Sequence, residues 1–482
     1  MTSSACRVSG RRFAEFRLAA VPLILALSGC AGFSPDAGLS AVAEMTAPSI
    51  RSDVVFIRSD EEAARAGAAV RRLLGAPLGA GSAVAIALLN NSGLQASYND
   101  LALAETDLVA ASLPPNPVFA VSRIAGDGAS EIERQVVGDI LALATLPFRS
   151  EIARDRFRQA QLRAALDTLR LASEVRRAYY RTVAAGRRAA LLADAQGTAA
   201  ALAQLAGKLG DTGAISKLDL AREQVFAAEM VAELAAARQD AASGRERLAR
   251  LLGLSGADLG FRLSDRLPPL PRRPPALATV EVDAIGHRID LQIARIELEA
   301  LAKSLDLTEA TRFVTMLELA GLDRRTVEPQ TSPFRERGFD IAFQIPVFDG
   351  GEVRLRQAAE TYRRAFNRLT DKAVNVRSEA RDAYRVYRSS YDIARQYQRE
   401  VLPLRSVIMQ EMQLRLSSMQ VDVFALVTEE RQRIASQRAA IDALRDFWLA
   451  QSDLDDAVNG GGAADRRDDG RVAVARAADA DR

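Results

Sequence analysis

The side chains that usually carry catalysis are almost absent from this chain of 482 residues. It has one histidine, His287, and two cysteines, Cys6 and Cys30, both close to the N-terminus. A single histidine cannot supply the histidine pair of a common zinc site, and it leaves a serine nucleophile no choice of base. No glycine-rich phosphate-binding motif follows an expected strand. We therefore predict a protein that is not an enzyme and has no catalytic, cofactor-binding or metal-ligating residues, with His287 as a surface or packing residue at a helix start.

Cys30 stands in a context that predicts covalent modification. Four arginines in the first 17 residues precede an apolar run, 18–27, that is too short to cross a bilayer as a helix. The run ends in Leu27-Ser28-Gly29-Cys30, which resembles a bacterial lipobox. On that resemblance residues 1–29 are a lipoprotein signal peptide, Cys30 carries lipid such as palmitate, and residues 30–79 form a lipidated arm. The alternative is an ordinary secretory signal with a chance cysteine.

The charges of the chain nearly cancel, with 64 basic and 62 acidic residues. They are interspersed at helical spacing, which is typical of solvated helix faces and leaves no polybasic surface for nucleic acid. Aromatic residues make up only 5% of the sequence, which favours helices over β-sandwiches. We therefore expect a mainly helical protein without a nucleic-acid partner.

The chain contains a long internal duplication. Four pairs of matching segments are separated by 197, 199, 205 and 206 residues, and they keep their order: Leu94-Gln95 with Leu291-Gln292, Leu146-Pro147 with Ile345-Pro346, Ser173–Tyr179 with Ser378–Tyr384, and Leu218–Glu223 with Phe424–Glu429. Such a period is too long for a solenoid repeat. Each copy is predicted to contain a helix, two short strands, a very long helix, a tight turn and another long helix.

The first copy is expected to begin with a helix that Ser82 caps and that runs to about residue 113, where a group of prolines ends it. The periodicity then predicts strands at 118–124 and 136–146, separated by Gly126-Asp127-Gly128, and a helix over 150–209.

In the second copy we expect a helix at 279–310 and strands at 313–319 and 338–347, with a polar loop holding Pro329 and Pro333 between them. A helix to about residue 416, kinked at Pro403, and a last helix at 423–458 complete this copy. The domain boundaries that follow are 80–254 for the first repeat, 255–278 for a Pro-rich linker, 279–458 for the second repeat and 459–482 for a disordered tail.

The last predicted strand alternates strictly between two kinds of side chain. Phe339, Ile341, Phe343 and Ile345 are bulky and apolar, whereas the residues between them are Asp, Ala and Gln. A soluble sheet packed on a core could produce this alternation. In a lipid-anchored envelope protein, the same pattern fits a strand with its apolar side toward lipid and its polar side toward a water-filled lumen.

The long helices carry apolar seams at heptad spacing. One seam runs through Ala380, Tyr384, Tyr387 and Tyr391, and residues 157–178 carry two stripes on one helix. Two seams on a helix require two helical neighbours, which is the condition for a closed ring of helices. The tyrosines are therefore interpreted as packing residues.

Several segments together resemble the TolC-like outer-membrane efflux proteins, over about residues 80–458. The matching segments are Ala87-Leu-Leu-Asn-Asn-Ser-Gly-Leu-Gln-Ala96, Leu113-Pro-Pro-Asn-Pro117, Ile345-Pro-Val-Phe-Asp-Gly-Gly351, Met419-Gln-Val-Asp-Val-Phe-Ala-Leu426 and Leu444-Arg-Asp-Phe-Trp-Leu-Ala-Gln451. The first junction, Leu146-Pro-Phe-Arg-Ser150, lacks the Asp-Gly-Gly of the second, and Asp422 stands where the family often has glycine.

The resemblance implies a mainly α-helical protein with a small membrane β-barrel. Three chains would form an α-helical tube and a 12-stranded barrel, four strands from each chain, in a lipid-anchored outer-membrane protein with a large periplasmic portion. It would conduct substrate passively from an inner-membrane pump and a periplasmic adaptor to the exterior, without a cofactor. The alternative is a lipid-anchored periplasmic coiled-coil scaffold with no lumen. Neither reading identifies the cargo, the pump or the adaptor.

The turns between the long helices are the expected docking sites for the adaptor. Helix ends leave backbone groups free, and these turns are rich in Gly and Ser. Two acids close to the turns, Asp219 and Asp422, could form a gate that favours cations, although they could equally cap helices or pair with nearby basic residues. The docking residues predicted from the turns are Gly210, Asp211, Gly213, Ser216, Ser417, Ser418 and Met419.

Overall fold

The computed structural model describes residues 32–50, 52–274, 277–329, 331–418, 420–421 and 423–460. The predicted signal peptide, Cys30, Met419, Asp422 and most of the predicted tail therefore lie outside the described residues. The chain divides into two compact units. The first unit comprises Met1–Gly38, Asp100–Ala160 and Ile296–Phe366, and the second comprises Leu39–Asn99, Gln161–Arg295 and Asn367–Arg482.

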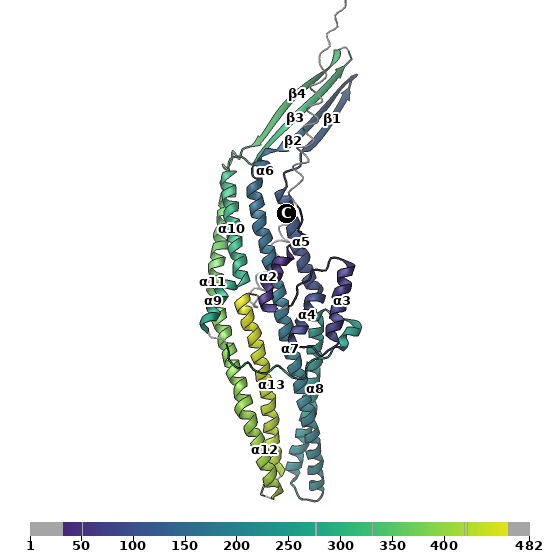
Figure 1. The fold of residues 1–482 in the computed structure, drawn as a ribbon, viewed down its shortest axis with the longest axis vertical. Helices are drawn as coiled ribbons and strands as arrows, with labels where there is room; N and C mark the ends of the chain where they lie inside the picture. Colours follow the sequence, from purple (N-terminus) through teal and green to yellow (C-terminus); the bar gives the residue numbers. More distant parts are fainter. Residues whose placement is uncertain are drawn as a thin grey trace, which may run out of the picture. The chain divides into compact units, whose positions relative to one another are not determined.

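The predicted element order occurs twice along the chain (Figure 1). The first copy consists of α5 (Ser92–Ser112), β1 (Val118–Gly126), β2 (Ala129–Asp139), α7 (Leu146–Asp211) and α8 (Lys217–Leu252). The second consists of α10 (Ile289–Ala310), β3 (Met316–Glu328), β4 (Thr331–Gln344), α11 (Glu352–Gln396), η2 (Tyr397–Val401), α12 (Leu402–Ser417) and α13 (Val423–Asn459). The expected fold class, long helices with a small antiparallel sheet, is confirmed.

Shorter elements precede and connect the two copies. They are α2 (Leu39–Ile50), α3 (Asp60–Leu74), α4 (Ala80–Asn90), α6 (Ile140–Ala144), the 3-10 helix η1 (Gly256–Gly260) and α9 (Leu277–His287). Part of the Pro-rich linker is held against the helices of the second unit, because Trp448 Nε1 donates to the Pro268 carbonyl at 2.9 Å. Tyr391 donates to the Pro271 carbonyl at 3.1 Å.

The four strands form one antiparallel sheet in the order β1-β2-β3-β4, so the two hairpins, one from each copy, pair through β2 and β3. The first hairpin turns at the predicted place. Asp127 and Gly128 both have positive φ, at 51° and 83°, which is the backbone of a two-residue hairpin turn that follows the twist of the strands.

The prediction for the second strand was wrong at both ends. We expected a strand over 136–146, but β2 covers Ala129–Asp139 and the apolar run that follows is the short helix α6. Asp139 causes the change, because its carboxylate accepts a hydrogen bond from the Ala142 backbone N–H at 2.8 Å and caps the helix. A continuous apolar run of five residues does not distinguish a strand from a buried helix.

The polar loop expected between the last two strands is also absent. β3 continues to Glu328 and β4 begins at Thr331, so both strands run through the charged segment. Cross-strand ion pairs take the place of apolar alternation there, including Arg324 with Glu133 at 2.6 Å. Pro333 lies inside β4, which is an edge strand, the position in a sheet where proline is tolerated.

Each predicted opening helix is divided in two. The breaks fall at Asn91 and at Arg288, which are 197 positions apart (288 − 91) and therefore equivalent in the two copies. Asn91 accepts a hydrogen bond from the Leu94 N–H at 3.0 Å and starts α5. Ser82 was predicted to be the N-cap of the first opening helix, and that prediction was wrong. Gly79 is the N-cap of α4, and the Ser82 hydroxyl, inside the first turn, accepts a hydrogen bond from the Gly79 N–H at 2.9 Å.

The first long helix is slightly longer than the predicted range 150–209, since α7 covers Leu146–Asp211. α7 has 66 residues, about 99 Å at 1.5 Å per residue. The predicted tyrosine seam is packing: Tyr387 and Tyr391 are buried against Phe447 of α13. At Pro403, the second residue of α12, the preceding turn widens into the π-helix η2, which is how the chain accommodates the missing N–H. Within the described residues, no helix combines the length and apolarity needed to cross a bilayer.

Candidate functional site

The four-stranded sheet has two chemically different faces. Cross-strand partners share a face, and alternate residues along a strand point to opposite faces. The register therefore assigns every strand residue to one of two sets. We call these the Phe339 face and the Asp340 face, after two neighbouring residues of β4.

The Phe339 face is apolar over the part of the sheet nearer α6. Phe339, Ile341 and Phe343, three of the residues predicted to face lipid, are 76%, 50% and 59% exposed. Their neighbours on the same face are also bulky and apolar, and they include Leu317, Leu319, Val136, Phe119 and Val121. A contiguous patch of this kind is rarely left in water, so the surface must meet lipid or protein.

The Asp340 face is acidic, although it also includes the exposed apolar residues Val118, Ile124 and Phe334. It carries one arginine, Arg324, and six acids, which are Asp139, Glu131, Glu133, Glu318, Glu336 and Asp340. Asp139 and Glu318 are direct cross-strand partners in the register between β2 and β3. Like charges directly opposite each other destabilise a sheet unless water or ions screen them, so this face is suited to an aqueous environment.

The sheet is open at both edges. β1 and β4 each pair on one side only within the chain, and four strands are too few to close into a barrel. Unpaired edges of this length offer backbone N–H and C=O groups to further strands. Further strands could therefore be added at either edge.

The junction between β4 and α11 fixes where the strand ends. Gly351 has a φ of 74°, and a Cβ placed there would lie 2.4 Å from the Arg312 carbonyl oxygen. Arg312 holds the same turn, because its Nε donates to the Gly350 carbonyl at 2.8 Å and its guanidinium contacts Glu352 at 3.0 Å. Asp349 accepts the Gly351 N–H at 3.0 Å. Ile345, the fourth predicted lipid-facing residue, lies just before this turn and is 51% exposed.

The turn between α7 and α8, the first of the two predicted docking turns, is held by side-chain contacts. Ser216 caps α8, and its hydroxyl donates to the Asp219 carboxylate at 2.7 Å. Asp219 also pairs with Arg222 at 3.2 Å. Gly213 has a left-handed backbone, with a φ of 73°, which favours glycine. At Gly210, a Cβ would lie 3.1 Å from the Leu220 side chain. In the part of the chain that the structure describes, Asp211 is exposed and forms no ion pair.

The second turn follows α12. Ser417 and Ser418 donate their hydroxyls back to the Leu414 carbonyl at 2.7 and 2.9 Å. The helices that leave the two turns contact each other, since Arg431 of α13 lies 3.4 Å from Glu223 of α8. Ile434 of α13 also packs in one apolar cluster with residues of α7 and α8. The structure thus brings the two predicted turns to one end of a single helical group (Figure 1).

No protein-family model matches the chain, and no curated protein matches it by sequence. Solved structures do match. The outer-membrane channel OprN superposes with a TM-score of 0.66 at 18% identity, over 87% of this chain and 96% of its own. CmeC, the outer-membrane channel of Campylobacter jejuni, gives 0.64 at 14%, over 82% and 86%. The open state of MtrE, the outer-membrane channel of Neisseria gonorrhoeae, gives 0.63 at 15%, over 81% and 89%.

The chain has the fold of these outer-membrane channels. The fold is what the sequence resemblance implied, and the match covers both copies of the duplicated module. At identities below 20% the likeness concerns the fold, and the chemistry of this chain has to be argued from its own residues.

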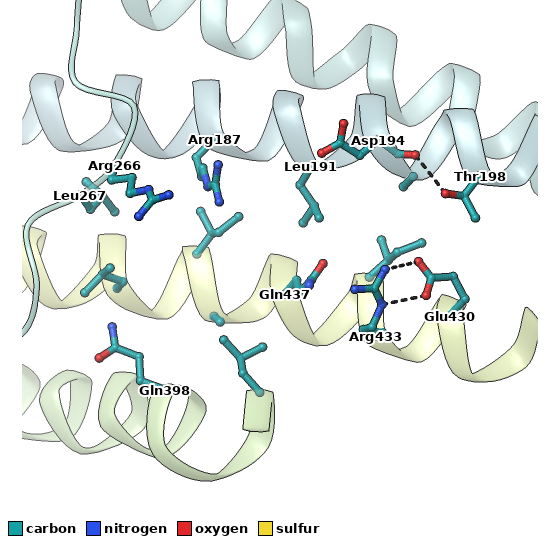
Figure 2. A pocket seen from close by; sticks show the side chains of 16 residues that line it. Arg187, Leu191, Asp194, Thr198, Arg266, Leu267, Gln398, Glu430, Arg433 and Gln437 are labelled. Carbon is teal, nitrogen blue, oxygen red and sulfur yellow. Dashed lines mark hydrogen bonds and ion pairs between the residues drawn. The ribbon is translucent and has the colours of Figure 1, made fainter. Parts of the chain in front are cut away.

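Within this channel fold, the second unit contains a cavity of about 500 Å³ beside the π-helix. Figure 2 shows Arg187, Leu191 and Asp194 of α7 on one wall, with Gln437 and Arg433 of α13 opposite. Gln398 of η2 closes a third side. Glu430 and Arg433 pair with each other at 2.6 Å. The cavity thus lies where α7 and α13 pass the widened turn η2.

Two buried ionic networks hold the helices of the second unit, and the sequence analysis assigned them no role. Asp456 of α13 accepts a hydrogen bond from Ser173 and pairs with Arg177 of α7 at 2.6 Å. Burial raises the pKa of Asp456, while Arg177 and Ser173 oppose the shift by favouring its ionised form. In the second copy, Arg288 pairs with Asp290 at 2.9 Å and with Glu379 at 2.5 Å.

The repeated Ser-Glu-x-Arg segments were the sequence signal for these networks, because Ser173 and Glu379 belong to them. His287 has no comparable role. It is exposed, and its Nδ1 lies 3.1 Å from the Asp283 carbonyl oxygen one helical turn earlier.

Proposed function

We propose that this protein is the outer-membrane exit duct of an efflux system. Three copies would join their sheets into one barrel and their helices into one tube, so that substrate passes from the periplasm to the exterior without entering lipid. The observation that carries the proposal is the open four-stranded sheet with one exposed apolar face and one acidic face, on a chain with the channel fold.

The number of strands supports three chains. A barrel of about eight strands is filled by its own side chains, whereas about twelve begin to leave an open lumen. Pairing β4 of one chain with β1 of the next would remove both open edges. The Phe339 face would then contact lipid and the Asp340 face would line the water-filled lumen.

The long helices support a helical tube. α7 alone has 66 residues, and its buried positions occur on more than one side along much of its length. A helix with neighbours on two sides fits a closed ring rather than a two-stranded rod. The duct itself would be passive, and energy would come from an inner-membrane pump joined through a periplasmic adaptor.

The adaptor would dock at the turns after α7 and α12, which hold Gly210, Asp211, Gly213, Ser216, Ser417, Ser418 and Met419. Replacing the Gly210–Ser216 turn should abolish export while leaving trimers intact. Normal export after the replacement would remove the docking proposal.

The gate proposal concerns Asp219 and Asp422. Asp219 is already engaged by Ser216 and Arg222, so a gate role would fall mainly on Asp422. Replacing Asp422 by alanine should raise conductance or weaken block by divalent cations, and an unchanged block would rule it out.

The membrane anchor is proposed at Cys30, which precedes the described residues. A Cys30→Ala variant should no longer take up labelled fatty acid or be cleaved by the lipoprotein peptidase, although barrel insertion should survive. Mass spectrometry that finds an unmodified N-terminus at another position would contradict the anchor.

The proposal as a whole is tested by purification and bilayer recording. A duct should run as a heat-resistant trimer on gels and should produce single-channel conductance in planar bilayers. A lipid-anchored coiled-coil scaffold would produce no conductance.

A further inference from the structure

Five arginines gather on the Phe339 face beyond its apolar part. The register places them in two successive rows across the sheet, next to the row of Phe339 and toward the hairpin turns. The nearer row contains Arg337, Asp323 and Arg134, and the farther row contains Arg335, Arg325 and Arg123. We call this set the arginine band.

The arginine band has one counter-charge for five arginines. Asp323 is the only acid in these two rows. It pairs with Arg335 and with Arg134, the latter at 3.8 Å, and lies opposite Arg337 in the register. Arg123, Arg325 and Arg337 are exposed and form no hydrogen bond or ion pair with any residue that the structure describes. The band therefore carries a net charge of about +4 per chain at neutral pH, because arginine is always protonated and the single carboxylate is paired.

The acids of the sheet cannot neutralise these arginines, because they lie on the opposite face. Arg324 and Arg325 illustrate the separation. Arg324 points to the Asp340 face and contacts Glu131 at 2.8 Å and Glu133 at 2.6 Å, whereas Arg325, the next residue, has no such partner. Pairing of β4 with β1 of a neighbouring chain, as the proposed trimer requires, would place the arginines of these two strands on adjacent strands of one sheet.

The band borders the apolar part of the same face. β4 advances seven residues from Arg337 to its last residue, Gln344 (344 − 337), which at about 3.3 Å per residue and a tilt of about 40° spans about 18 Å of height. Exposed apolar residues, among them Ile345 and Val347, follow the end of the strand. The arginines therefore lie at the end of the apolar part that is nearer the hairpin turns, where the hydrocarbon would give way to headgroups.

We propose that the arginine band binds the phosphate groups of anionic lipids in the outer leaflet around the barrel. Arginine is suited to this partner because its planar guanidinium donates two parallel hydrogen bonds to a phosphate. Basic residues at a membrane surface attract anionic headgroups, and each one contributes measurably to the affinity. The inference rests on the proposed function, since it requires the Phe339 face to meet lipid.

The test uses the full-length trimer in uncharged detergent, with native mass spectrometry to measure binding of bis-phosphorylated lipid A and of its dephosphorylated form. Wild-type protein should retain the phosphorylated lipid preferentially. Arg325→Gln should weaken its binding roughly threefold to tenfold. Arg324→Gln, the matched control one residue away on the other face, should leave the binding unchanged. Arg325→Lys should bind with an affinity between those of wild type and Arg325→Gln, because it keeps the charge but loses the two parallel hydrogen bonds.

Equal loss in Arg325→Gln and Arg324→Gln, or equal binding of the two lipid forms, would overturn the inference. Circular dichroism and gel mobility of each variant show whether it folds and trimerises. If Arg325→Gln fails to do so, the lipid binding of Arg325→Lys provides a second measurement. A trimer that conducts but binds the two lipid forms equally contradicts the lipid proposal alone. A trimer that prefers the phosphorylated lipid but does not conduct contradicts the proposed duct function.

Discussion

The two faces of the sheet are built from the same four strands, yet they differ in the sign and the distribution of their charges. The Phe339 face has an apolar part followed by the arginine band, whereas the Asp340 face holds six acids and one arginine. Since neighbouring residues alternate between the faces, a slip of one residue in register would exchange them. The comparison shows that the register of the strands, rather than composition, determines what each surface can contact.

The largest expected effect comes from placing charge on the apolar part of the Phe339 face. Ile341→Arg or Phe343→Arg should cost roughly 2–4 kcal/mol if these residues meet lipid near the bilayer midplane. Denaturant unfolding in lipid vesicles measures the cost. Their neighbours provide the controls, because Ala342→Arg and Gln344→Arg should fold normally and alter conductance. Equal destabilisation by both pairs would mean that the alternation serves a protein core.

An effect of comparable size is expected at the turn that ends β4. Gly351→Ala places a Cβ 2.4 Å from the Arg312 carbonyl at a φ of 74°, so the turn must shift. We expect a loss of stability of about 2–4 kcal/mol, from backbone strain and from the clash together. Gly350→Ala is the matched control, because its φ is also positive but its Cβ would meet nothing within 4 Å. Thermal unfolding should rank Gly351→Ala below Gly350→Ala, and the reverse order would show that the contact does not fix the turn.

The acidic face should determine ion preference rather than stability. Neutralising Asp340 and Glu318 together, as Asn and Gln, should reduce the preference for cations, because fewer fixed negative charges would face the lumen. Asp323→Asn is the control on the other face and should leave the preference unchanged. Reversal potentials in a salt gradient give the answer. A shift caused by Asp323→Asn, with none from the double variant, would reverse the assignment of the faces.

The smallest effect is expected at Arg324. Its ion pairs with Glu131 and Glu133 are exposed, so Arg324→Gln should change the stability only slightly. Unfolding in low and in high salt measures this contribution, which should decrease as salt screens the pairs. A large loss of stability that salt does not reduce would indicate that the Asp340 face is shielded from water.

The parts of the fold that repeat over many residues were predictable from sequence. The 66 residues of α7 carry an uninterrupted helical pattern, and the repeated segments predict the same element order in the second copy. Shorter elements depended on single side chains. Asp139 turns an apolar run into α6, and ion pairs across β2, β3 and β4 extend strands through a charged segment that resembles a loop.

The candidate site was predictable where its pattern lies within a single strand. The alternation around Phe339 and Asp340 is visible in sequence, but the arginine band is not, because its members come from four strands and their register is a tertiary property. The same holds for the network around Asp456, whose partners Ser173 and Arg177 are 283 and 279 residues away. Spacing along the chain cannot show contacts of that range.

The central claim is that three chains enclose an aqueous lumen lined by the Asp340 face. The most direct measurement is bilayer conductance of single-cysteine variants before and after addition of a bulky, water-soluble thiol reagent. The chain is suited to it, since its natural cysteines are Cys6 and Cys30, the first inside the predicted signal peptide and the second the predicted lipid site. We expect the reagent to reduce the conductance of Ala342→Cys and to leave that of Ile341→Cys unchanged. An absence of conductance, or equal block of the two variants, would contradict the account.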